Sequence, residues 1–184
     1  MNFRYILLII TAFIFFVFLG IYFYIEDPSL KIVSTPAFSE GTFSIQALPS
    51  NWNFLEPHKH ILHKDSDVEF MSSDHNAFGM VIAETLEQPL SAETLRKLAL
   101  SYPEKQLEGF TIQHEETIIN TDKEAQYIIY SGSYEGKKYT YAAWYVMKDK
   151  ALFQIITWSL ENNFEKYLDS FQKIFNNFSL LKKS

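Results

Sequence analysis

The chain has 184 residues, enough for one domain in addition to an apolar N-terminal segment, and its aromatic content of 17% supplies bulky side chains for a core. Beyond Arg4, 15 basic residues stand against 22 acidic ones, so this part carries a formal net charge of −7 and is a poor match for nucleic acid. The absence of cysteine excludes disulfides, thiolate metal sites, a cysteine nucleophile and a lipidated cysteine anchor.

The first predicted element is a transmembrane helix over Tyr5 to Ile25, within an anchor at residues 1–25. Its 21 residues carry no charge, and a helix rising ~1.5 Å per residue spans the ~30 Å hydrocarbon layer with about that number. A cleaved signal peptide has a shorter apolar region of about 7–15 residues, closely followed by small residues. Because Arg4 precedes the span and acidic residues follow it, we expect a single-pass protein of the cytoplasmic (inner) membrane. Its N-terminus then lies in the cytoplasm and its domain in the periplasm or outside the cell.

A tether is predicted over residues 26–40, where proline, serine and threonine occur without clear periodicity. The domain then covers residues 41–184. Its first predicted strand, Thr42 to Leu48, alternates apolar and polar residues until Pro49 interrupts the pattern. Strands are also expected at 67–72 and 78–86, where large apolar residues lie between turn formers.

A helix is predicted to begin after Ser91, which would cap it, and to kink or end at Pro103. Four strands are predicted next, at 111–119, 125–132, 138–147 and 151–158. The last three are separated by two short polar breaks, Glu135-Gly136 and Lys148-Asp149-Lys150. These breaks indicate consecutive antiparallel hairpins.

The final predicted helix runs from Phe164 to Phe178, where apolar residues recur at helical spacing, and Asn162 with Glu165 is its expected cap. The order is therefore βββ-α-ββββ-α, preceded by one transmembrane helix. It predicts an α+β fold in which helices flank an antiparallel sheet, an α/β/α sandwich, because each helix has one apolar stripe to bury.

The stretch from Phe43 to Trp52, with its strand and Pro49, resembles the opening of PsbP-like and DcrB-like domains. The second half of such domains is similar to the segment that contains Ala125, Tyr130, Gly136, Tyr145, Phe153 to Thr157, Phe164, Phe171, Phe178 and Ser179. The resemblance covers residues 41–180. It implies the α/β/α sandwich shared by PsbP, DcrB and the yeast Ran-binding import factor, and it implies no catalytic motif. Relatives bind proteins, stabilise photosynthetic complexes or act as chaperones for apolar helices.

A histidine cluster is the strongest candidate for metal chemistry. His58, His60 and His63 lie within six residues and are followed by several aspartates, and imidazole and carboxylate groups are ligands for zinc and similar ions. The alternative is a solvated loop or edge strand, because Lys59 and Lys64 are interleaved with the histidines and would repel a cation.

Other catalytic patterns are incomplete. His114-Glu115-Glu116 lacks the second histidine of H-E-x-x-H, and Ser131-Gly132-Ser133 has no identifiable base or oxyanion site. We therefore expect no enzymatic activity and no cofactor.

Three tyrosines, Tyr139, Tyr141 and Tyr145, fall on one face of a predicted strand. This face is either a surface for a partner or apolar ligand, or the part of the sheet that the C-terminal helix covers.

The sequence thus predicts a binding or accessory module without enzymatic activity, anchored in the membrane through residues 5–25 and contacting an envelope protein. Two alternatives are a metal-binding protein or metal-dependent enzyme built on the three histidines, and a domain that holds an apolar ligand between sheet and helix.

Overall fold

The computed structural model describes residues 38–40, 42–56, 59–120 and 123–181. The predicted transmembrane span and residues 26–37 of the predicted tether lie outside these ranges. Among the residues within them, no helix has the length and apolar character needed to cross a membrane.

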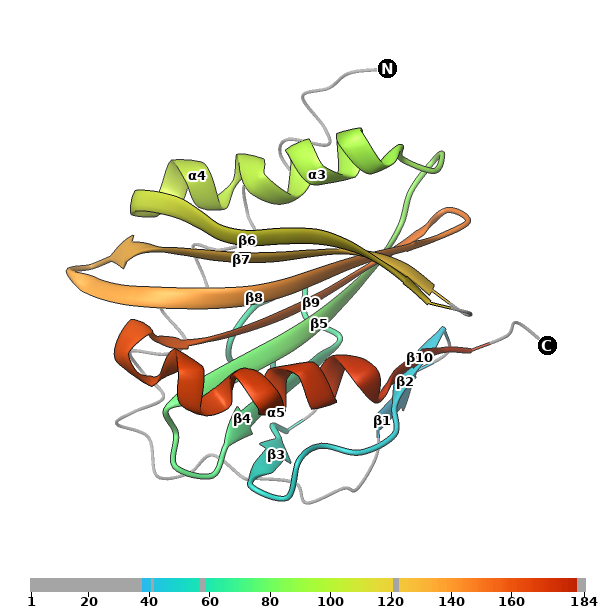
Figure 1. The fold of residues 1–184 in the computed structure, drawn as a ribbon. Coiled ribbons are helices and arrows are strands. Elements are labelled where there is room, and N and C mark those ends of the chain that lie inside the picture. The colour runs from blue at the N-terminus through green and yellow to red at the C-terminus, as the bar shows by residue number, and fades with distance from the viewer. Residues whose placement is uncertain (1–37, 41, 57–58, 121–122, 182–184) are drawn as a thin grey trace.

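A seven-stranded antiparallel sheet forms the centre of the domain, with the strand order β3-β4-β5-β9-β8-β7-β6 (Figure 1). Its strands are β3 (Trp52–Phe54), β4 (Val68–Ser72), β5 (Ala77–Thr85), β6 (Glu108–Asn120), β7 (Lys123–Tyr134), β8 (Lys137–Lys148) and β9 (Ala151–Leu160). Six of these strands coincide with predicted ones. The strand β3 was not predicted, because three residues are too few to show an alternating pattern.

The strands β6 to β9 form consecutive hairpins, as the polar breaks predicted. The turn between β7 and β8 consists of Glu135 and Gly136, whose φ values are 49° and 75°. Asp149, in the turn between β8 and β9, has a φ of 53°. Positive φ at the turn residues matches the right-handed twist of the flanking strands, so these turns favour tight hairpins.

A second, three-stranded sheet corrects the predicted place of the first strand. β2 (Phe43–Ile45) pairs with β1 (Phe38–Glu40) on one side and with β10 (Phe178–Leu180) on the other. The first predicted strand therefore does not join the main sheet, whose outer position beside β4 belongs to β3. Residues 38–40, assigned to the tether from the sequence, form a strand.

The helices lie on both sides of the main sheet. α3 (Ala92–Ser101) and α4 (Pro103–Gln106) lie on one side, and α5 (Phe164–Asn176) lies on the other (Figure 1). The hydroxyl of Ser91 accepts a hydrogen bond from the backbone N–H of Thr94, which confirms the predicted cap. Pro103 ends α3 and begins α4, as expected of a residue that lacks an N–H donor.

The start of α5 differs from the prediction. A 3-10 turn, η1 (Glu161–Asn163), precedes it, and Asn163 rather than Asn162 occupies the cap position, without a side-chain hydrogen bond. Phe178, predicted as the last apolar residue of this helix, lies in β10. The architecture is nevertheless the predicted mixture of an antiparallel sheet with helices on both faces.

Two apolar cores follow from the alternation of side chains along the strands. The core on the α3 side contains Leu95 and Ala99 of the helix packed against tyrosines of the sheet. The core on the α5 side contains Phe171 and Phe175 packed against Trp144 of β8. The Trp144 and Phe175 rings stack with their centroids 5.0 Å apart. Each helix layer thus buries one face of the same sheet.

Candidate functional site

Residues 59–66, which include His60 and His63, form a loop that is folded around the carboxylate of Glu69. This side chain, on β4, is 5% exposed. Its two oxygens accept hydrogen bonds from three consecutive backbone N–H groups, those of Ile61, Leu62 and His63, at 2.7–2.8 Å. The hydroxyl of Ser66 donates a fourth at 2.7 Å. Successive N–H groups that point at one carboxylate form an anion-binding concavity, and the anion here belongs to the protein itself.

His63 is buried inside this loop, and its ring nitrogen Nδ1 accepts a hydrogen bond from the backbone N–H of Asp65 at 3.1 Å. Burial, together with electrostatic repulsion from Lys64 and His60, lowers the pKa of His63 to about 3. The imidazole is therefore neutral at physiological pH and lies in the loop as a packed, hydrogen-bonded side chain.

Two of the three predicted metal ligands, His60 and His63, lie within the described residues, and their surroundings differ. His60 is exposed and has a φ of 47°, whereas His63 is buried, and His58 lies outside the described residues. Within the part of the chain that the structure describes, no three histidine, aspartate or glutamate side chains gather so as to hold a metal ion. A site that includes His58 stays a prediction.

The residues of the two incomplete catalytic patterns lie on the neighbouring strands β6 and β7. Ser131 on β7 is buried, and its hydroxyl accepts a hydrogen bond from the amide of Gln113 on the neighbouring strand at 3.1 Å. His114 is exposed on β6, 3.4 Å from Glu116. Gly132 allows two segments to pack closely, because a Cβ atom there would lie 2.5 Å from Leu107 Cβ. The glycine of the Ser-Gly-Ser segment thus leaves space for Leu107, the residue directly before β6.

The three tyrosines of β8 do share one face, but the helix that covers them is not the predicted one. Tyr139, Tyr141 and Tyr145 are all buried in the core on the α3 side. The alternative that the C-terminal helix covers them is wrong, because α5 packs on the opposite face, against Trp144. Contact of these rings with a partner would require the core on the α3 side to open.

A small pocket lies between α3 and this tyrosine face. Its walls include Leu95 and Ala99 of the helix and Tyr130 and Tyr145 of the sheet, and its volume is ≈ 30 Å³. That space holds about one water molecule, whereas ligand pockets typically measure about 300–1,000 Å³. In this conformation the interface between helix and sheet is packed rather than open to an apolar ligand.

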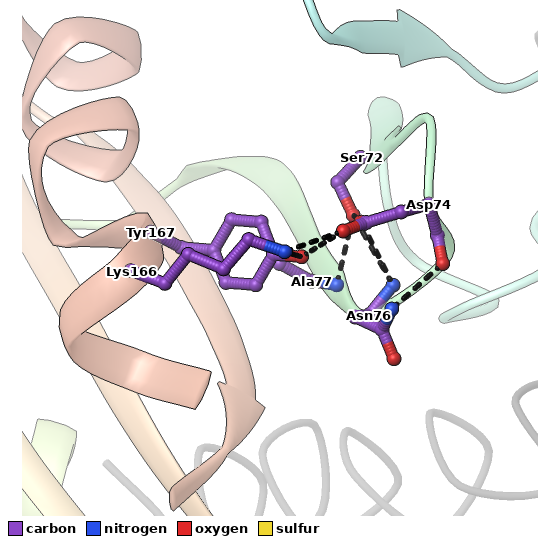
Figure 2. Close-up of polar contacts among 6 residues, drawn as sticks. All are labelled: Ser72, Asp74, Asn76, Ala77, Lys166 and Tyr167. Carbon is purple, nitrogen blue, oxygen red and sulfur yellow. Dashed lines mark hydrogen bonds and ion pairs between the residues drawn. The ribbon is translucent and has the colours of Figure 1, made fainter. Parts of the chain in front are cut away.

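A third polar cluster joins the turn between β4 and β5 to the helix α5 (Figure 2). Asp74 accepts hydrogen bonds from the ammonium of Lys166 at 2.7 Å and from the hydroxyl of Tyr167 at 2.5 Å. Ser72 donates to the other carboxylate oxygen at 2.7 Å and accepts from the backbone N–H groups of Asn76 and Ala77. The cluster therefore fixes both the shape of the turn and its contact with the helix.

The charge of Asp74 is stabilised by these contacts. Partial desolvation opposes ionisation, but the hydrogen bonds from Lys166, Tyr167 and Ser72 outweigh it and hold the pKa of Asp74 well below its usual value. The same contacts raise the pKa of Lys166. In the sequence, Asp74 is only one of the aspartates that follow the histidine cluster, because its helical partners lie more than ninety residues away.

No protein-family model and no curated protein matches the chain, but solved structures do. LpqN from Mycobacterium tuberculosis, described as involved in cell envelope biogenesis, is 16% identical, has a TM-score of 0.59, and aligns over 86% of this chain and 95% of its own. The cyanobacterial PsbP protein, CyanoP, from Synechocystis is 11% identical, with a TM-score of 0.54 over 84% of this chain and 94% of its own. The fold is PsbP-like.

The PsbP-like fold extends to a third structure. Protein PA94 of unknown function from Pseudomonas aeruginosa is 12% identical, with a TM-score of 0.52 over 85% of this chain and 97% of its own. The resemblance inferred from Pro49, Trp52 and the second half of the chain is thereby confirmed at the level of fold. At identities of 11–16% the likeness concerns the arrangement of strands and helices, and a shared fold does not by itself carry a shared activity.

Proposed function

We propose that this protein is a non-enzymatic accessory module, anchored in the cytoplasmic membrane, that binds another protein of the cell envelope. The observation that carries the proposal is the uncharged run from Tyr5 to Ile25 in front of a PsbP-like domain. The similarity to LpqN, whose description places it in cell envelope biogenesis, supports an extracytoplasmic role.

The described polar side chains favour binding over catalysis. Glu69 holds a loop, Asp74 joins a turn to a helix, and Ser131 bonds to the neighbouring strand. The hydrogen bonds of these groups fix a loop, a turn and a strand pair of the fold. With a pocket of ≈ 30 Å³ beneath α3, the domain is suited to recognise a partner through its outer surface.

Site-specific labelling of intact cells tests the membrane topology. The chain has no cysteine, so Asp149→Cys, in the exposed turn between β8 and β9, provides one reactive thiol. We expect a membrane-impermeant maleimide to label this variant in intact cells, and the labelled protein to remain with the membranes after a carbonate wash. The cysteine-free parent chain is the control for specificity. Labelling only after lysis, or recovery in the soluble fraction, would contradict the proposal.

Photo-crosslinking in membranes tests the binding role. A photoreactive amino acid is placed at exposed positions on α3, α5 and β6 in the full chain, and at the buried Ile155 as a control. We expect a discrete adduct with a second envelope protein from a contiguous group of exposed positions and none from Ile155. Absence of an adduct at every exposed position, or adducts equally distributed over the surface, would count against an accessory role.

A further inference from the structure

The two edges of the main sheet are protected to different degrees. The edge strand β3 has three residues, whereas the opposite edge strand, β6, has 13. Most residues from Thr111 to Ile119 are exposed (Figure 1 shows β6 at the margin of the sheet). Proteins shield an edge by shortness, proline, charged side chains or bulges; β6 contains no proline or lysine, and its bulges are confined to its first half. Among the described residues, no strand pairs with the outer side of β6.

The second half of β6 is regular enough to pair. The register between β6 and β7 shifts near Gly109 and again near Gln113, where extra residues bulge. From His114 to Asn120 the register runs without a shift, seven residues in succession. This stretch carries Ile119, which is 80% exposed and has the largest exposed fraction among the large apolar side chains of the described residues.

The sequence of this stretch is compatible with antiparallel pairing to itself. A two-fold axis perpendicular to the sheet through Thr117 pairs all seven residues within the regular stretch. Glu116 then lies opposite Ile118 of the second copy, and Glu115 lies opposite Ile119, so that no two carboxylates are directly opposite each other. An axis through Glu115 or Glu116 would place two glutamates opposite each other, and an axis through Ile118 would extend the pairing beyond Asn120.

We propose that two copies of this chain associate through β6, with the stretch His114–Asn120 pairing antiparallel to itself about Thr117. The two seven-stranded sheets would then form one continuous sheet, and Ile119 would be covered by the partner strand. This inference does not depend on the proposed function, because it concerns self-association and holds whether or not an envelope partner exists. Each chain carries a formal net charge of −6, so we expect salt to strengthen the association by screening repulsion.

Disulfide formation at single introduced cysteines tests the register in the full chain, in membranes. In the proposed pair, residue 117 lies opposite itself, with a Cα separation of about 4.5–5.5 Å that a disulfide can bridge. We expect Thr117→Cys to give a covalent dimer on oxidation. Ile112→Cys, exposed on the same strand, is the matched control, since its two copies would lie about 34 Å apart at ~3.4 Å per residue. No dimer from Thr117→Cys, or equal dimer from both variants, would overturn the proposal.

A mixed pair keeps the test valid if Thr117→Cys is poorly folded. Residue 115 of one copy lies opposite residue 119 of the other, so differently tagged Glu115→Cys and Ile119→Cys chains are expected to crosslink when they are expressed together. Each variant expressed by itself should crosslink poorly, because its own copies are about 14 Å apart. Mixed and single samples that crosslink equally would exclude this register.

Discussion

The carboxylate of Glu69 contributes to stability through its hydrogen bonds rather than through chemistry. Hydrogen bonds to a charged group contribute more than neutral ones, about 1.5–3 kcal/mol each. Because the four donors to Glu69 come from one loop, we expect loss of the carboxylate to affect this loop from Ile61 to Ser66. The buried charge is stabilised by backbone donors and a hydroxyl, without a basic side chain among these four.

Glu69→Gln is expected to lower the free energy of unfolding by about 2 kcal/mol. The glutamine amide offers one acceptor oxygen, so either the N–H of Ile61 or the donors to the other oxygen lose their acceptor. Urea unfolding in detergent measures the change. Glu87→Gln, at an exposed position, is the matched control and should change stability by less than about 0.5 kcal/mol. Equal stability of both variants would show that the loop does not depend on the carboxylate.

The buried imidazole of His63 makes stability depend on pH. Its pKa of about 3 in the folded chain lies below the usual 6.5, so between these values the unfolded state binds more protons and protonation favours unfolding. Stability is complete above pH 6.5 and is lost as pH falls towards 3, by at most about 1.4 kcal/mol per pH unit.

Unfolding measured between pH 7 and 4 checks this dependence. His63→Asn should reduce the slope of stability against pH, whatever its effect on stability at pH 7. His114→Asn, at an exposed site on β6, controls for loss of a histidine. A slope unchanged in His63→Asn would refute the assignment.

Asp74 affects stability over a lower pH range. Because its pKa in the folded chain is lowered, its contribution to stability is complete above the usual aspartate pKa, near pH 4, and is lost as the pH falls below that value.

The residue-level roles were the least predictable from the sequence. The histidines form a conspicuous pattern, but Glu69, which holds the loop around His63, looks like an ordinary strand residue in the sequence. Its role depends on three backbone N–H groups that converge only in the folded loop. Asp74 likewise depends on Lys166 and Tyr167, which come from a distant helix. Local spacing carries no information about such contacts.

At the scale of elements, the close packing of β4 on β5 depends on a glycine. A Cβ atom at Gly79 would lie 2.2 Å from Cε2 of the Phe70 ring, which is fully buried on the neighbouring strand. Gly79 pairs directly with Phe70 in the antiparallel register. The ring therefore lies across the glycine, and neither strand can move without disturbing the core on the α5 side.

Gly79→Ala is expected to destabilise the domain by about 1–3 kcal/mol, because the added methyl group overpacks the core. Combining it with Phe70→Leu removes the clashing ring, so the double variant should lose less stability than the sum of the two single variants. Urea unfolding of the three variants gives the coupling energy. Additive losses would indicate that the ring is not the obstacle.

Long alternating or helical patterns were predictable element by element, whereas three of the four three-residue strands were not, β2 being the exception. The hairpins from β6 to β9 and the helix α5 follow from ten or more residues of consistent pattern. By contrast, β1, β3 and β10 are each too short to show a period, and their pairing is decided by contacts between distant segments. This is why Phe178 was placed at the end of the helix instead of in a strand.

For the whole molecule, the sequence predicted the layers but not which helix covers which face. The alternation along β8 correctly grouped Tyr139, Tyr141 and Tyr145 on one side. Both helices are amphipathic, however, and either stripe is chemically compatible with an aromatic face. In the fold, the tyrosines lie in the core on the α3 side, and α5 packs on the opposite face.

The pairing of β2 with β10 has a consequence for how the protein is made. Phe43 near the start of the domain stacks on Phe178 near its end, with ring centroids 5.5 Å apart. During synthesis from the N-terminus, β2 therefore emerges long before β10, the strand that completes its sheet. The apolar side chains of β2 cannot be fully buried until the last residues of the domain have been made. Closing a loop of nearly the full domain length is entropically slow, so the hairpins from β6 to β9 are free to form first and the ends of the domain meet last.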